Sequence, residues 1–121
     1  MTKIKLSSTN NENRNHLEES CSEIYAINLI RGQWILSIFY YLKNNRLRYT
    51  DLKNCIPNIT DKMLATQLKK MEDNHLINRY VYAEVPVRVE YELSEVANKF
   101  LPILQELKAW GRMHKEYLKQ I

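Results

Sequence analysis

The side chains best suited to chemistry in this sequence lie between residues 60 and 70. Hydroxyl, amide and ammonium groups recur there, at Thr60, Lys62, Thr66, Gln67, Lys69 and Lys70. Such groups donate hydrogen bonds to base edges and phosphate oxygens, which is the chemistry of nucleic-acid binding. Arg88, in a later extended segment, would add a backbone or minor-groove contact. Each residue alone is more typical of a solvated surface, so the prediction rests on the set.

Catalytic chemistry has no comparable set of residues. The three histidines, His16, His75 and His114, are not spaced with a cysteine or carboxylate as a metal site or nucleophile would require. Only two glycines are present, so the chain has no glycine-rich loop for a phosphate. We therefore expect no enzyme activity, no catalytic residue, no metal and no cofactor.

The elements that position residues 60–70 follow from the hydrophobic pattern. Apolar residues at i, i+4 and i+7 predict a helix from Thr60 to about Asn74, with Leu64, Leu68 and Met71 buried. A shorter helix, residues 51–56, precedes it, with Thr50 as its cap and Leu52 and Ile56 inward. From residue 77 to 93 the apolar positions alternate, which predicts a two-stranded hairpin with its tip at residues 84–86.

Further helices are expected on both sides of this region. Ser20 and Glu23 fit a capping box, which predicts that the first helix begins at Ser20. A second helix is expected from residue 33 to about residue 43, followed by a short extended piece at residues 47–49. Ser94 is expected to cap one long helix that runs to the C-terminus.

This order of elements predicts a winged helix-turn-helix, in which two short helices joined by a tight turn precede a β-hairpin. The expected fold class is mainly α with a small β-hairpin (α+β). Residues 1–19 are polar and asparagine-rich, so we expect a mobile arm there and the folded domain at residues 20–121.

The composition is compatible with a polyanionic partner but does not require one. The formal net charge of the 121-residue chain is +4. Residues 1–19 contain no apolar block of a secretory signal, and no apolar run approaches the roughly 18 residues of a membrane span. We therefore expect a cytoplasmic protein. No predicted helix joins a basic face to an apolar face left free by the fold, so no membrane partner is expected.

The last helix carries more large apolar side chains than one small core requires. The excess residues suggest a surface that a second copy of the chain covers, at Leu104, Leu107, Trp110, Tyr117, Leu118 and Ile121. The alternative is that all of them pack on the chain's own core.

From about residue 21 to residue 111 the chain resembles the HxlR-type regulators of the wider MarR-like winged-helix group. The shared landmarks fall in order, at Cys21, 29–34, 48–52, 59–64 with Gln67 and Leu68, 84–91 with Leu93 and Ser94, and Trp110–Gly111. The chain departs from the family at Arg31, where glycine is frequent, and in a wing made acidic by Glu84, Glu90 and Glu92. These departures do not change the expected fold. They concern how much of the wing contacts DNA.

The resemblance implies a prokaryotic homodimer that binds double-stranded DNA at an inverted-repeat operator and represses or activates nearby genes. It also implies dimerisation through the terminal helices. Some members of the family use a cysteine at the position of Cys21 to sense quinones, aldehydes or oxidants, which makes these the candidate inducers.

The residues themselves leave the role of Cys21 open. Its place in the first turn of a helix favours the reactive thiolate, whereas Glu18, Glu19 and Glu23 oppose it. A purely structural role is the alternative. Cys55 is expected to be buried, and a disulfide between the two cysteines remains possible because sequence does not give the Cα separation.

The main rival function is a winged-helix protein-interaction module that does not bind DNA. Such a surface is expected to carry aromatic anchors. The polar face of residues 62–70 has none, and Tyr80 and Tyr82 near the wing are the only candidates.

Overall fold

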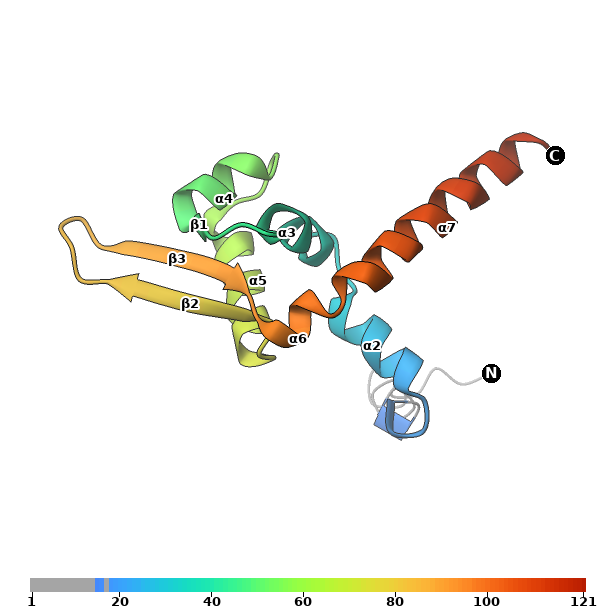
Figure 1. Ribbon diagram of the computed structural model, residues 1–121, viewed down its shortest axis with the longest axis horizontal. Coiled ribbons are helices and arrows are strands. Elements are labelled where there is room, and N and C mark those ends of the chain that lie inside the picture. Colours follow the sequence, from blue (N-terminus) through green and yellow to red (C-terminus); the bar gives the residue numbers. More distant parts are fainter. Residues whose placement is uncertain (1–14, 17) are drawn as a thin grey trace, which may run out of the picture. The chain divides into compact units, whose positions relative to one another are not determined.

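The computed structural model describes residues 15–16 and 18–121 (Figure 1). The described part divides into two compact units, one ending at Leu36 and the other running from Ser37 to Ile121. Most of the arm predicted at residues 1–19 lies outside the described residues. Residues 15, 16, 18 and 19, which are described, are helical.

In the first unit, helix α2 spans Ser22–Ile30. The predicted capping box is wrong, because Ser20 belongs to the preceding helical residues 18–20 and its hydroxyl donates to the His16 carbonyl at 3.0 Å. Cys21 has extended backbone angles and is the N-cap of α2, without a side-chain cap bond. No residue of α2 is buried.

The second unit contains nearly all of the buried apolar side chains. Helix α3, Ile35–Leu42, crosses the boundary between the units, and its later part contributes Ile38, Phe39 and Leu42. The other buried apolar residues of this unit are Leu52, Ile56, Ile59, Leu64, Leu68, Met71, Leu76, Ile77, Tyr91, Leu93 and Ala97. The helices and the sheet therefore share one core.

Two helices of this unit are the predicted pair. Helix α4 spans Tyr49–Cys55 with Arg48 as its N-cap, so the prediction that Thr50 caps it is wrong. Helix α5 spans Asp61–Asp73, so it begins one residue after the predicted start at Thr60. The Thr60 hydroxyl caps the helix by accepting a hydrogen bond from the Met63 amide. His75, with a φ of 57°, ends α5 in a Schellman motif: the Leu76 amide donates to the Met71 carbonyl at 2.8 Å.

The sheet has three antiparallel strands in the order β1-β3-β2, with bounds Leu47–Arg48, Ile77–Tyr82 and Arg88–Leu93. β2 and β3 are the predicted hairpin, and β1 adds to its other edge (Figure 1). In the register Tyr80 lies opposite Glu90 and Tyr82 opposite Arg88. The polar side chains of the hairpin therefore meet across the strands.

The C-terminal helix is broken, contrary to the prediction of one long helix. Helix α6 spans Glu95–Asn98 and helix α7 spans Leu101–Lys119. Pro102 explains the break, because it has no N–H for the Asn98 carbonyl and its ring clashes with that turn. Phe100, at the break, packs edge-to-face on Phe39, with ring centroids 5.3 Å apart.

Ser94 and Thr50 provide a matched test of the two predicted caps. The Ser94 hydroxyl accepts from the Ala97 amide at 3.2 Å and donates to the His75 carbonyl at 2.8 Å, whereas Thr50 lies inside α4. We expect Ser94→Ala to lower the free energy of unfolding by about 1–2 kcal/mol and Thr50→Ala by less than about 0.5 kcal/mol. Urea denaturation measures both, and equal losses would contradict the cap assignments.

Candidate nucleic-acid interface

Helix α4 holds the first turn of α5 through polar contacts. The Tyr49 hydroxyl donates to the Asp61 Oδ1 atom at 3.1 Å, and the Lys53 Nζ atom lies 3.9 Å from the same oxygen. Burial and, after it, the Asp61 hydrogen bond raise the pKa of Tyr49 above its ordinary value of 10.0. The start of α5 is thereby fixed relative to α4.

The buried and exposed sides of α5 are those that the sequence predicted. Leu64, Leu68 and Met71 have at most 2% of their surface exposed. The polar residues between them point away from this buried stripe: Lys62, Thr66, Lys69 and Lys70 are exposed, and Gln67 is half-buried. The structure therefore brings the predicted contact residues of α5 together on one helix face.

Two of the predicted contact residues between positions 60 and 70 already have partners within the chain. The Thr60 hydroxyl accepts from the Met63 amide at 3.1 Å. The Lys69 Nζ atom donates to the Asp73 Oδ1 atom at 2.9 Å, and this hydrogen bond is the main reason why the pKa of Lys69 is raised. Both partners of the Lys69–Asp73 pair are exposed, so solvent screens it and a phosphate can replace the carboxylate.

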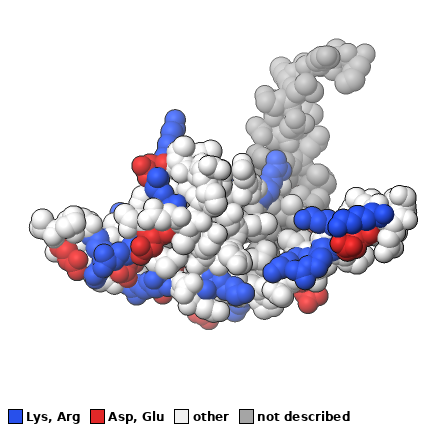
Figure 2. Space-filling model, turned by 90° about the horizontal axis from the view of Figure 1, so that it is seen from above, with Lys and Arg blue, Asp and Glu red and all other residues white. Residues whose placement is uncertain are grey.

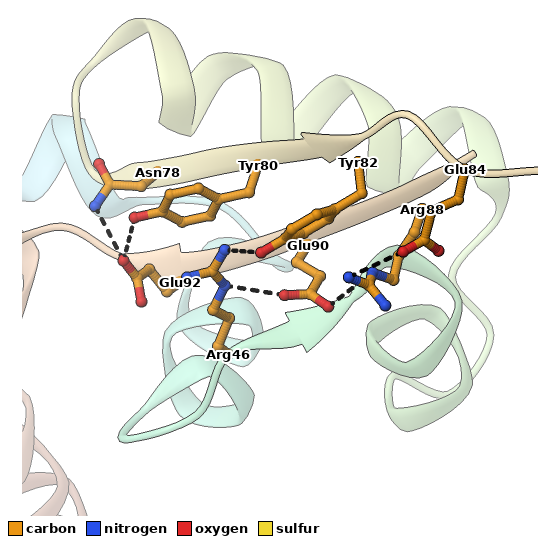
Figure 3. Close-up of polar contacts among 8 residues, drawn as sticks. All are labelled: Arg46, Asn78, Tyr80, Tyr82, Glu84, Arg88, Glu90 and Glu92. Atoms are coloured by element: carbon orange, nitrogen blue, oxygen red, sulfur yellow. Dashed lines mark hydrogen bonds and ion pairs between the residues drawn. The ribbon is translucent and has the colours of Figure 1, made fainter.

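The polar face of the hairpin carries a continuous network (Figure 3). At its centre, the Glu90 carboxylate lies between two guanidinium groups: Arg46 Nε is 2.9 Å from one oxygen and Arg88 Nε is 3.2 Å from the other. Arg88 also contacts Glu84 at 3.3 Å. Each cation lies over a ring, Arg46 at 3.5 Å from the Tyr80 centroid and Arg88 at 4.1 Å from that of Tyr82.

The network changes what was expected of Arg88. We expected a side chain free to reach DNA, but its guanidinium is ion-paired and only 26% of the side chain is exposed. Arg46, which also donates to the Tyr82 hydroxyl, was missed by the sequence analysis. Its only signal would have been the pairing of β1 with β3, which places Arg48 opposite Glu90 and brings Arg46 to the same edge.

At the base of the hairpin, Glu92 accepts hydrogen bonds from Tyr80 and Asn78 (Figure 3). The Tyr80 bond is the largest cause of the lowered pKa of Glu92, and the same bond raises the pKa of Tyr80. The carboxylate form is therefore stabilised in the fold. Its contribution to stability is present above the ordinary carboxyl pKa and is lost as the pH falls through the lowered one.

A hollow of about 480 Å³ separates the wing tip from the start of α4. Residues 48–50 line one side, and residues 84–89 with Tyr91 line the other. Val85 and Val87 at the tip are largely exposed. The tip thus projects beyond the helix pair.

Helix α7 presents an apolar stripe to solvent within the single chain. Its exposed residues recur at helical spacing, at Ile103, Leu107, Trp110, Tyr117 and Ile121, with Leu118 beside them. The Trp110 and His114 rings are stacked, with centroids 5.4 Å apart. Of the predicted dimer residues only Leu104 is half-buried, so the alternative that all of them pack on the chain's own core is wrong.

A basic row runs along another side of α7. Lys108, Arg112, Lys115 and Lys119 recur at i, i+4, i+7 and i+11 and are exposed. Figure 2 shows long basic side chains with some acidic groups at its right-hand end, where α7 lies, and intermixed acidic and basic groups at the hairpin end. The expectation that no helix joins a basic face to a free apolar face is therefore wrong for the single chain.

Both cysteines are free thiols and half-buried. The prediction that Cys55 is buried is therefore wrong. Cys21 lies at the N-cap of α2, where its carbonyl accepts from the Tyr25 amide at 3.2 Å. Glu18, one of the acidic residues near Cys21, accepts from the Asn28 side chain at 2.8 Å.

Among residues 15–16 and 18–121, no three metal-ligating side chains lie close enough together to hold an ion. None of the helices in this described part is long and apolar enough to cross a membrane.

An antiparallel hairpin that directly follows two short helices, the second with an exposed polar face, defines a winged helix-turn-helix protein. The chain belongs to the HxlR family, since the family model described as an HxlR-like helix-turn-helix matches residues 29–119. The resemblance seen in the sequence is thereby confirmed.

Similar proteins are regulators of transcription. An HTH-type transcriptional regulator of Methanothermobacter thermautotrophicus is 43% identical over 97 residues, which cover 80% of this chain and 74% of the relative. A crystal structure of a MarR-family regulator from Porphyromonas gingivalis W83 is 37% identical, with a TM-score of 0.73 over 78% of this chain and 92% of that one.

The redox regulator HypR is also similar. Its reduced form is 31% identical, with a TM-score of 0.73 over 80% of this chain and 96% of that one. Its oxidised form is 32% identical, with a TM-score of 0.69 over 77% and 96%. This protein is accordingly a transcriptional regulator of the HxlR and MarR winged-helix type.

Proposed function

We propose that the protein is a homodimer that binds duplex DNA in a sequence-specific way, with α5 of each subunit in the major groove. The observation that carries the proposal is the exposed polar face of α5. Its buried stripe fixes the orientation of the helix, and its contacts with α4 fix its first turn. Membership of a family of helix-turn-helix regulators supports DNA as the partner.

The residues of α5 divide into two roles in this proposal. Lys62, Lys69 and Lys70 neutralise phosphates, while Thr66 and Gln67 are short enough and polar enough to contact base edges. A two-fold dimer would place its α5 helices in successive major grooves, roughly 34–36 Å apart, on an inverted-repeat operator. Arg88 adds a wing contact only when it leaves its carboxylate partners.

The apolar stripe of α7 supports the homodimer. An exposed run of large apolar side chains is expected to be covered by a partner, and a second copy presents the same run. The basic row of α7 stays at the edge of such an interface, in contact with solvent.

Cys21 is the proposed redox sensor of this regulator. The likeness to HypR, which is described in reduced and oxidised forms, supports the assignment. The Cys21 thiolate would add to a quinone ring by 1,4-addition. A C–S bond forms, and the ring takes up a proton and becomes a hydroquinone. The adduct would shift the equilibrium between two dimer geometries and so change operator occupancy. Oxidation to a disulfide with Cys55 is the alternative outcome.

DNA binding is tested by fluorescence anisotropy with the protein's own upstream DNA and a scrambled duplex. If each subunit neutralises three or four phosphates, log K should fall with log salt at a slope of about −5 to −7. Lys70→Ala removes one phosphate contact from each subunit, so it should weaken both duplexes alike and reduce that slope by about 2. Gln67→Ala should instead change the preference between the duplexes.

Lys119→Ala, on α7, is the matched control for Lys70→Ala. Equal losses on both duplexes for Gln67→Ala would contradict its base-reading role. If the wild-type protein binds neither duplex at low salt, the DNA proposal is wrong and the protein-interaction module is the better account.

The dimer is tested by sedimentation equilibrium of α7 variants. Trp110→Ala removes a large exposed ring from the centre of the stripe, so we expect the dimer dissociation constant to rise by about 30-fold or more, as at interface hot spots. Lys108→Ala, on the basic row, should leave it unchanged. A wild-type chain that sediments as a monomer would contradict the proposal.

The sensor is tested by adding a quinone or a mild oxidant to the preformed DNA complex. We expect release of the wild-type protein and retention of Cys21→Ser, because serine cannot form the adduct. Cys55→Ser separates the two modes. It should still release DNA with a quinone, but it should not respond to an oxidant that acts by forming the Cys21–Cys55 disulfide, within or between subunits. Release of Cys21→Ser at the wild-type concentration of quinone would remove Cys21 from the mechanism.

A further inference from the structure

The polar face of the hairpin points to a second determinant of affinity. We propose that Glu90 limits the DNA affinity of this regulator by holding Arg46 and Arg88 in ion pairs that a phosphate must replace. The inference rests on the proposed DNA binding and names the residue that tunes it.

One carboxylate serves both cations in this arrangement. Its two oxygens face different guanidinium groups, at 2.9 Å from Arg46 and 3.2 Å from Arg88 (Figure 3). Only 18% of the Glu90 side chain is exposed, so the carboxylate is less screened by water than those of ordinary surface pairs. Loss of Glu90 would therefore remove a carboxylate partner from both arginines at once, and of its described ion pairs Arg88 would keep only that with Glu84.

The aromatic rings explain why the arginines stay in place. Arg46 lies over Tyr80 and Arg88 over Tyr82, and cation–π attraction adds to the ion pairs. The Arg46 guanidinium also donates a hydrogen bond to the Glu90 carboxylate. The Arg88 guanidinium lies within ion-pair distance of its carboxylate partners, but its buried Nε–H group makes no hydrogen bond within the described residues. Both guanidinium groups therefore lie at the wing but are engaged in contacts within the chain.

The network of the hairpin has no excess of positive charge. Arg46 and Arg88 carry two positive charges, and Glu84, Glu90 and Glu92 carry three negative charges. A phosphate that approaches the wing meets no net attraction there, and it is repelled by any carboxylate that an arginine leaves. The lysines of α5, of which only Lys69 has a carboxylate partner within the helix, then provide most of the electrostatic attraction.

Neutralising Glu90 should accordingly strengthen DNA binding. Glu90→Gln keeps the size of the side chain and removes its charge. Arg46 then loses its ion pair, and Arg88 keeps only its ion pair with Glu84, so both bind a phosphate more readily. We expect the dissociation constant for the upstream DNA to fall about two- to fivefold, in the range of single exposed ion pairs. If one further arginine of each subunit contacts a phosphate, the slope of log K against log salt should become steeper by about 2.

The matched control is Glu116→Gln. It removes the same charge, also from an ion pair, but on α7, where Glu116 lies 3.1 Å from Lys119. Full-length wild-type, Glu90→Gln and Glu116→Gln proteins are compared by anisotropy across a salt series. Arg88→Gln combined with Glu90→Gln should lose part of the gain, because one of the released cations is gone.

The outcomes separate the two proposals. Salt-dependent wild-type binding with tighter binding only for Glu90→Gln supports both. Salt-dependent wild-type binding with Glu90→Gln equal to, or weaker than, Glu116→Gln overturns the inference and leaves DNA binding intact. No binding by the wild type removes both. If thermal melting shows that Glu90→Gln is unfolded, Glu84→Gln takes its place. It removes one ion pair of Arg88 at the exposed tip, and its DNA affinity is compared with that of Glu116→Gln in the same way.

Discussion

The burial of one side of α5 is the constraint on which the rest of the account depends. Leu64, Leu68 and Met71 are enclosed by the core, so the rotation of the helix about its axis is fixed. A turn of the helix about its axis would bury lysines and expose leucines, which costs several kcal/mol. Thr60 and His75 set the two ends of the helix, and Tyr49 holds its first turn. The polar face therefore has a defined position before any ligand arrives.

Electrostatics divide the remaining surface into parts with different tasks. Helix α5 presents lysines, of which Lys69 forms a solvent-exposed ion pair with Asp73. The hairpin instead holds its arginines between carboxylates and aromatic rings. The formal net charge of +4 hides this contrast, because it counts a paired arginine and a free lysine alike. The affinity of each part of the surface for a polyanion depends on the positions of its cations and on their partners.

Sequence reasoning succeeded where local chemistry determines the structure. The periodic leucines gave α5, Thr60 gave its start, and the alternation of apolar residues gave the hairpin. It failed at two helix boundaries. Thr50 has the chemistry of a cap but lies inside α4, because the helix already begins at Tyr49. Pro102 was a local signal that predicts the break before α7, and it was overlooked.

The candidate site shows the same division. The contact face of α5 follows from spacing alone, since residues three and four apart share a side of a helix. The network around Glu90 does not, because it depends on the register of β2 with β3 and on the pairing of β1, which sets Arg46 beside them. An alternation pattern fixes which residues share a face but not which residues stand opposite, so the occupied state of Arg88 could not be foreseen.

Hydroxyl-radical footprinting of the protein on its own upstream DNA tests the central claim most directly. Two α5 helices related by a two-fold axis should protect two backbone patches separated by about one helical turn, roughly 34–36 Å, and the patches should be symmetric about their centre. A single patch, protection without that spacing, or uniform cleavage at protein concentrations that saturate binding would contradict a dimer that reads DNA through α5.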